Sequence, residues 1–180
     1  MNKMTFSGIC NKVCNMAIAN YHLLNHTDRP KENPFGKNTI EHFIYLKCWA
    51  HTAIWHLENH SPGTDADGKG EAQIRQRLET SRKEQDEATE KARQVIVLLC
   101  KTKNPQAEAC LAADRLIDTI NRFADLLLQI YHASEQIINP NASMEQIGKC
   151  QQMLDEMIIQ KTSLSILLDQ QMGQICREPK

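Results

Sequence analysis

The sequence predicts an all-α fold, an up-and-down bundle of four long helices plus a shorter N-terminal helix. Apolar residues recur at three- and four-residue spacing through five segments, which is the period of helices that each bury one face. Gly and Pro are scarce, with seven and six in 180 residues, and no segment alternates apolar and polar residues as a half-buried strand does. Short connections between such helices favour antiparallel neighbours.

Breaker and capping residues set the expected bounds of each helix. Asn38 followed by Glu41 and Ser143 followed by Gln146 have the spacing of capping boxes, which begin helices. Clusters of Pro, Gly, Asn and Asp then end the helical patterns. In chain order the helices are expected over residues 7–25, 38–60, 71–102, 107–138 and 143–176.

The chain is expected to form one helical-bundle domain over residues 1–180, with loop 61–70 and the C-terminal tail 177–180 flexible. Its length is sufficient to bury a core without metal or disulfide. No motif implies a cofactor, and none is predicted.

The composition excludes several classes of partner. The net charge is −1, the pI is about 6.6 and aromatic residues are 5%, so the chain lacks the basic and aromatic surface of a nucleic-acid-binding protein. No run approaches the roughly 18 apolar residues of a membrane span. The seven Cys form no CxxC pair, which favours reduced, buried thiols over a disulfide framework. We therefore expect a cytoplasmic protein.

Residues 47–59 hold the densest group of chemically active side chains. At about 100° per residue, Lys47, His51, Trp55 and Glu58 fall on one apolar side of the second helix. From there they could meet Ser81 and Gln85 on the third helix and Tyr131, His132 and Glu135 on the fourth. A buried charge needs a partner, because desolvating it alone costs several kcal/mol. The cluster is therefore either a Lys–Glu pair that fixes helix register or a ligand or catalytic pocket.

The pocket interpretation assigns roles by residue type. His56 would be a general base with Glu58 and Glu135 as carboxylate partners, since His titrates near neutrality. Lys47 or Arg122 would hold an anionic substrate, such as a sugar- or nucleotide-phosphate-like molecule. The candidate catalytic residues are thus His56, Glu58, His132 and Glu135, and the candidate ligand-binding residues are Lys47, His51, Trp55, Arg122 and Tyr131.

A metal site is not predicted. His56 and His60 lie four residues apart, which is a zinc-compatible spacing on a helix, but no HExxH, paired ExxH or cysteine pair supplies further ligands.

Several segments resemble an uncharacterised bacterial family. The most specific are Trp55-His56-Leu57-Glu58 and Ile130-Tyr131-His132, and the likeness extends over most of the chain. The sequence resembles the domain of unknown function forty-two fifty-four. That resemblance implies an all-helical, soluble bacterial protein with no established activity. Further matching segments are Ala17–His22, Asn33–Phe35, Ile40–His42, Arg77–Glu79, Asn121–Phe123 and Lys149–Gln151.

The chain also departs from the pattern that the resemblance implies. The family tends to have Asp where this chain has His51, Asn59, Asn121 and Ser163. If relatives use clustered carboxylates for a cation or for acid–base chemistry, this chain has lost about half of them. Our leading hypothesis is therefore a small non-catalytic binding or accessory protein, and an enzyme or ligand-binding protein with an interhelical pocket is the alternative. The expected partner is a protein or a small anionic ligand, and a homo-oligomer could form through the helix seams.

Overall fold

The computed structural model describes residues 4–24, 35–36, 39–59, 69–100 and 105–176, and within them it contains five α-helices and no strand. The all-α class is confirmed. The first two helices have 19 and 20 residues and the last three have 31, 33 and 32, so the second helix is closer in length to the first than to the later three. The helices are α1 (Phe6–Leu24), α2 (Ile40–Asn59), α3 (Lys69–Leu99), α4 (Pro105–Ile137) and α5 (Met144–Ile175).

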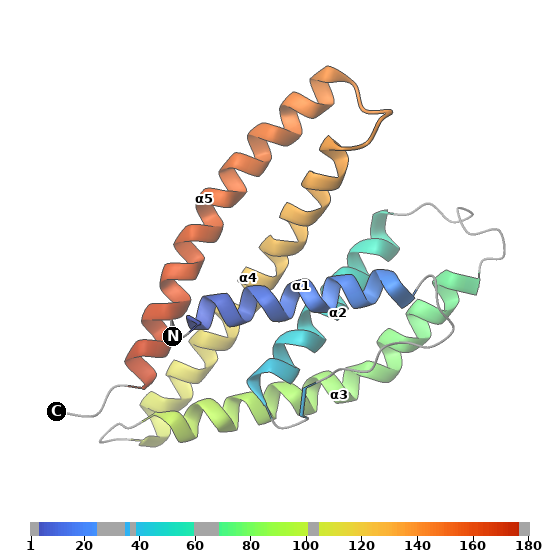
Figure 1. The fold of residues 1–180 in the computed structure, drawn as a ribbon. Coiled ribbons are helices and arrows are strands. Elements are labelled where there is room, and N and C mark those ends of the chain that lie inside the picture. The colour runs from blue at the N-terminus through green and yellow to red at the C-terminus, as the bar shows by residue number, and fades with distance from the viewer. Residues whose placement is uncertain (1–3, 25–34, 37–38, 60–68, 101–104, 177–180) are drawn as a thin grey trace.

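The arrangement is a helical hairpin with three helices packed against one half of it (Figure 1). Helices α4 and α5 run side by side, and the end of the hairpin where they are joined extends away from α1, α2 and α3. We call residues 126–166 the α4–α5 arm; its outer end projects, and its inner end still contacts α2, where Trp55 stacks on His132. None of the described helices has the combination of length and apolar character that crossing a membrane requires.

The main core lies where all five helices meet. Its buried side chains include Phe43 and Ile44 of α2, Ile96 of α3 and Leu116 of α4. Each such side chain stabilises the fold by roughly 1.5–3 kcal/mol when fully buried. The arm has a separate small apolar cluster of Leu126, Ala133 and Met157, which α4 and α5 form together.

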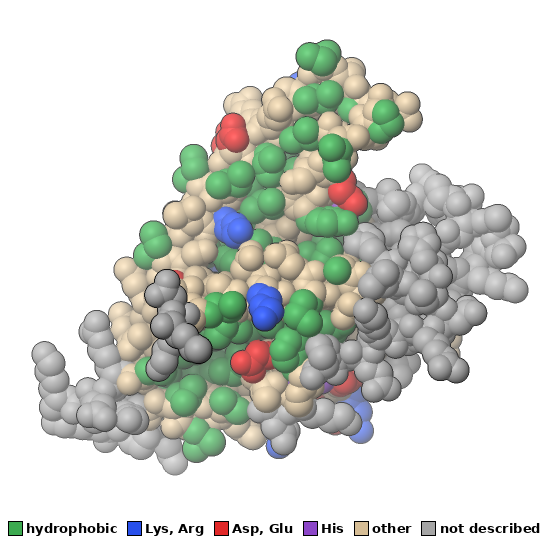
Figure 2. Space-filling model, in the orientation of Figure 1, with side chains coloured by type: hydrophobic (Ala, Val, Ile, Leu, Met, Phe, Trp, Pro, Cys, Tyr) green, Lys and Arg blue, Asp and Glu red, His purple; other side chains and the backbone are tan. Residues whose placement is uncertain are grey.

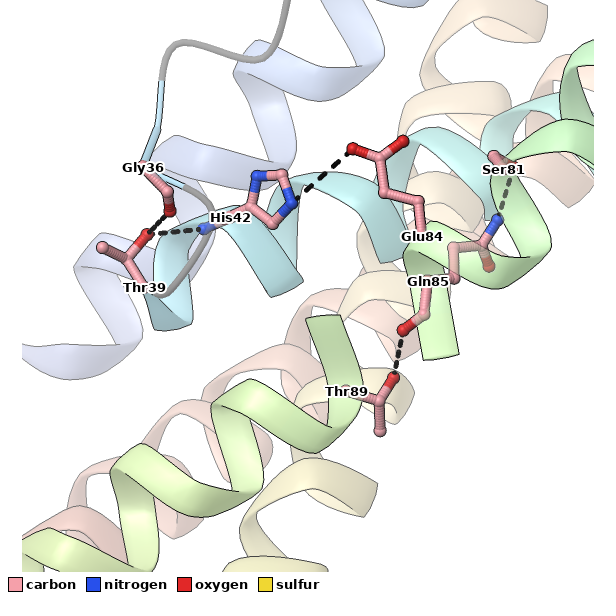
Figure 3. Close-up of polar contacts among 7 residues, drawn as sticks. All are labelled: Gly36, Thr39, His42, Ser81, Glu84, Gln85 and Thr89. Atoms are coloured by element: carbon pink, nitrogen blue, oxygen red, sulfur yellow. Dashed lines mark hydrogen bonds and ion pairs between the residues drawn. The ribbon is translucent and has the colours of Figure 1, made fainter. Parts of the chain in front are cut away.

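The N-terminus of α2 differs from the sequence expectation. Thr39 caps the helix, because its Oγ1 accepts a hydrogen bond from the backbone N–H of His42 at 3.2 Å. The same hydroxyl donates to the carbonyl oxygen of Gly36 at 2.7 Å (Figure 3). Asn38 lies outside the described residues. Both residue types cap helices well, so the sequence alone could not separate two adjacent candidates.

Two other helix starts are fixed by side chains. The capping box at the start of α5 is confirmed, since Ser143 and Gln146 bond to each other's backbone N–H groups. The start of α1 is capped from a distant helix: the carboxylate of Asp169 accepts from the backbone N–H and the hydroxyl of Ser7, at 2.9 Å and 2.8 Å. This contact joins the first and last helices.

Loop 61–70 is shorter than expected, because α3 already begins at Lys69. The remainder of that loop and the tail 177–180 lie outside the described residues.

Cys14 of α1 and Cys48 of α2 form a disulfide with Cα atoms 5.3 Å apart. The expectation that all thiols are reduced is therefore wrong for these two. They lie 34 residues apart without a motif, and only the packing of α1 on α2 brings them together. The nearby thiol of Cys10 is free, and burial, assisted by the charge of Asp169, raises its pKa to about 12. A thiol with so high a pKa is a poor nucleophile at neutral pH.

Candidate functional site

The predicted polar cluster lies mainly between α2 and α4. Lys47, His51 and Trp55 follow one another at four-residue intervals and so share one side of α2. The facing side of α4 presents Asp125, Tyr131, His132 and Glu135. We call these seven residues the polar seam.

An aromatic stack dominates one end of the polar seam. The indole of Trp55 and the imidazole of His132 are nearly parallel, with an interplanar angle of 10° and centroids 3.2 Å apart. His132 is only 7% exposed. Two rings in van der Waals contact leave no room for a ligand between them. At this point the two helices are therefore packed directly against each other.

His132 is also the centre of a polar group on α4. Its Nδ1 lies 3.4 Å from Oε2 of Glu135, and its ring meets that of Tyr131 edge to face at 5.4 Å between centroids. Burial raises the pKa of Tyr131, and the Glu135 carboxylate raises it further by hydrogen bonding and charge. The phenol therefore stays protonated well above neutral pH. Three predicted site residues, Tyr131, His132 and Glu135, thus lie in mutual contact.

The other end of the polar seam has a more open histidine. Nδ1 of His51 lies 3.9 Å from Oδ1 of Asp125, beyond hydrogen-bond distance. Burial lowers the pKa of His51. The charge of Lys47 lowers this pKa further, and the charge of Asp125 raises it. The imidazole is therefore neutral at pH 7. The ammonium of Lys47 lies 6.0 Å from the centroid of the Phe43 ring, at the outer limit of a cation–π contact.

Those of the remaining predicted site residues whose side chains the structure describes are not joined to these contacts. Arg122 is exposed on α4. The side chains of His56 and Glu58 lie outside the described residues, so the proposed base and its first carboxylate stay predictions. Ser81 and Gln85 bond to each other along α3, Nε2 of Gln85 donating to Oγ of Ser81 at 2.8 Å, instead of reaching across to the polar seam (Figure 3).

A second histidine contact lies on the opposite side of α2. His42 is buried, and its Nε2 is 3.8 Å from Oε1 of Glu84 on α3 (Figure 3). This pair borders a surface hollow of about 430 Å³ that is strongly acidic. Within the described chain, no group of three His, Cys, Asp or Glu side chains is placed to hold a metal ion. The hollow is lined by His42, Glu84, Glu87, Ala88, Glu90, Lys91 and Gln94.

Two participants were missed by sequence reasoning. Asp125 faces His51 and lies seven residues before His132, so the heptad spacing along α4 was a usable signal. The contact between Glu84 and His42 had no such signal, because it depends on how far α3 slides along α2.

Comparison with known proteins gives a family but no activity. No curated protein and no solved structure matches the chain. A family model described as a protein of unknown function matches residues 41–180, which includes the polar seam and the α4–α5 arm and excludes α1. The chain therefore belongs to the family of proteins of unknown function designated DUF4254.

Proposed function

We propose that this chain is a non-catalytic binding module, an accessory protein that acts by docking another protein on its α4–α5 arm. The observation that carries the proposal is the apolar surface of the arm. Helix α5 buries only Met157, Leu168 and Ile175 of its 32 residues. Large exposed apolar side chains of the arm are Ile138, Met144, Met153, Ile158, Ile159 and Ile166.

This surface differs from the usual scatter of single apolar residues. Hydrophobic side chains gather on the face formed by α4 and α5 (Figure 2), and contiguous apolar patches on soluble proteins commonly mark interaction sites. A two-helix hairpin cannot enclose its own core as a four-helix bundle does. A partner that adds helices to the arm would bury this surface.

The contacts within the polar seam also support a non-catalytic role. Its most buried histidine, His132, is stacked on Trp55, and its carboxylates pair with neighbours on the same or the facing helix. These contacts suit a role in fixing the register of α2 against α4. We propose this role for the polar seam in place of catalysis.

Comparative capture tests the docking proposal. Wild-type protein and the variant Ile159→Asp would be immobilised and exposed to extract of the source cells, with Leu98→Asp as control, since Leu98 is 83% exposed on α3, away from the arm. We expect a protein that wild type and Leu98→Asp retain and Ile159→Asp loses, and that binds again when purified. Identical retention by all three would contradict the proposal.

The half-exposed His51 favours one alternative, a site for a small anionic ligand such as a sugar or nucleotide phosphate. A neutral imidazole beside Asp125 and Lys47 has the residue types for proton transfer near a phosphate. An anion bound there would raise the pKa of His51. An NMR titration of the imidazole with and without inorganic phosphate measures this, and an unchanged pKa would exclude the alternative at this position.

We further propose the bacterial cytoplasm as the compartment. The Cys14–Cys48 disulfide counts against it, because stable disulfides are rare in the cytosol. Rapid acid quenching of cells, followed by alkylation of the unfolded protein in denaturant and mass spectrometry, decides the matter. Both cysteines should be alkylated if the protein is cytoplasmic, and protection of the pair would place it elsewhere.

A further inference from the structure

Three free cysteines gather at one end of the fold. Cys100 follows the last residue of α3, Cys110 lies in the first two turns of α4, and Cys176 follows the last residue of α5. These three helix ends converge far from the joined end of the α4–α5 hairpin (Figure 1). We propose that Cys100 and Cys176 are an oxidation site, at which hydrogen peroxide converts the two thiols into a reversible disulfide. The inference does not depend on the docking function of the arm.

Packing brings the ends of α3 and α5 onto the same core. Cys100 and Met172 are both half-buried against the main core, and Ile175, the neighbour of Cys176, is part of that core. Sγ of Cys176 lies 3.8 Å from Sδ of Met172. The sulfur of Cys176 is therefore turned toward the side of α5 that meets the core, where the end of α3 also packs.

The thiol of Cys100 is close enough to the other two thiols to feel their charges. Burial raises the pKa of Cys100, the charge of Cys176 raises it further, and the charge of Cys110 has a smaller effect in the same direction. Because the interaction between two charges weakens with distance, Cys176 is the favoured partner of Cys100.

The backbone holds both cysteines in place. The N–H of Cys100 donates to the carbonyl oxygens of Ile96 and Val97, each at 3.1 Å, and the N–H of Cys176 donates to that of Met172 at 3.0 Å. Two thiols fixed on the same folded chain have a high effective concentration. A bond within one molecule should therefore form faster than a bond between two molecules.

Exposure divides the roles of the two thiols. Peroxide reacts with an accessible thiolate, and Cys176 is exposed whereas Cys100 is half-buried. The raised pKa of Cys100 keeps its thiol protonated at neutral pH. Cys176 is therefore oxidised first and Cys100 is the resolving thiol, which is the usual arrangement of a redox-sensitive pair.

The oxidation proceeds in two steps. The thiolate of Cys176 attacks one oxygen of hydrogen peroxide, the O–O bond breaks, and the second oxygen leaves as water after taking up a proton. Sγ of Cys100 then attacks Sγ of the Cys176 sulfenic acid. The S–S bond forms as the S–O bond breaks, and the hydroxide leaves as water with the Cys100 proton. In sum, two thiols lose two electrons to one peroxide, and two waters form.

Peptide mapping of peroxide-treated protein tests the pairing. Remaining thiols would be alkylated in denaturant, and the peptides would be separated without reductant and identified by mass spectrometry. We expect a Cys100–Cys176 disulfide that forms within single molecules, at the same rate at low and high protein concentration, and that glutathione reduces. Oxidation of Cys176 to sulfinic acid with Cys100 still a free thiol would overturn the inference, as would a Cys100–Cys110 disulfide.

Single variants separate the two roles. In Cys100→Ser, and equally in Cys100→Ala, the sulfenic acid of Cys176 should persist and be captured by dimedone, whereas in wild type it should be captured far less. Cys110→Ser should form the disulfide as wild type does. So should Cys150→Ser, a matched control because Cys150 is a half-buried free cysteine of the arm. Equal capture in wild type and Cys100→Ser would overturn the role of Cys100.

Thermal melting gives a readout that is independent of mass spectrometry. A bond between Cys100 and Cys176 closes a long loop of the chain, so peroxide should raise the melting temperature of wild type by at least about 5 °C. Peroxide also oxidises methionine, and Cys100→Ser measures that contribution. A shift that is the same in wild type and Cys100→Ser would overturn the proposed bond.

Discussion

The stack of Trp55 on His132 gives a quantitative prediction about the polar seam. The perturbation is a double-mutant cycle of Trp55→Leu, His132→Leu and the two together. Parallel rings with centroids 3.2 Å apart are in full contact, and aromatic pairs contribute about 0.5–1.5 kcal/mol beyond the area they bury. Each single substitution should lower the free energy of unfolding by roughly 1–2 kcal/mol, since leucine is apolar and fills part of the space that each ring leaves. The double variant should lose about 1 kcal/mol less than the sum.

The assay is urea unfolding followed by far-ultraviolet circular dichroism, which avoids relying on the fluorescence of the substituted tryptophan. For a domain of this length, 1 kcal/mol corresponds to about 2–4 °C in melting temperature, so thermal melts provide an independent check. Additivity of the two substitutions to within about 0.3 kcal/mol would refute the claim that the rings stabilise the seam through their contact.

Three further predictions concern other parts of the fold. Under non-reducing conditions, Cys14→Ser with Cys48→Ser should lower the free energy of unfolding by up to about 4 kcal/mol, the chain-entropy value for a 34-residue loop, and added reductant should abolish the difference measured in urea. Asp169→Ala should cost about 1–2 kcal/mol, because the N–H and hydroxyl of Ser7 lose their acceptor, while Thr5 still accepts from the N–H of Gly8. Proteolysis of the N-terminus should accelerate, and an unchanged cleavage rate would argue against the contribution of Asp169. Burial lowers the pKa of His51 in the folded state, so as pH falls the unfolded chain binds a proton before the folded chain does. Wild type should therefore lose stability relative to His51→Gln as pH falls below about 6.5. Unfolding curves at a series of pH values measure this, and a difference in free energy of unfolding that is constant with pH would contradict it.

Helix positions were predictable because each depends on local sequence. The capping box of Ser143 and Gln146 was found at the expected place, and the expected helix bounds lie within three residues of those in the structure. The error at Thr39 is of the same local kind, since two adjacent residues could both cap. Periodicity was less reliable on α2: at about 100° per residue Ile54 shares the side of Lys47 and His51, yet it is 46% exposed. Three helices pack around α2, so the side of α2 that faces solvent depends on their placement and not on the pattern of α2 alone.

Contacts between helices were predictable only in part. Helical phase placed His51 and Trp55 on one side of α2, and both meet residues of α4. It could not specify that Trp55 would stack on His132, because this depends on how far the two helices slide along each other. The Cys14–Cys48 disulfide was unpredictable for the same reason. It joins two helices, and no local sequence pattern indicates how they align along each other.

The central claim is that the polar seam joins two helices and that binding occurs on the arm. A thermal-shift screen with a panel of anionic metabolites, including sugar and nucleotide phosphates, tests it most directly. A ligand at a hundred times its dissociation constant stabilises the fold by about 2.7 kcal/mol, which is a rise of about 5–10 °C for a domain of this size. We predict that no member of the panel raises the melting temperature by more than about 1 °C. A rise of 5 °C or more that disappears in Lys47→Met would contradict the claim and identify the polar seam as a ligand site.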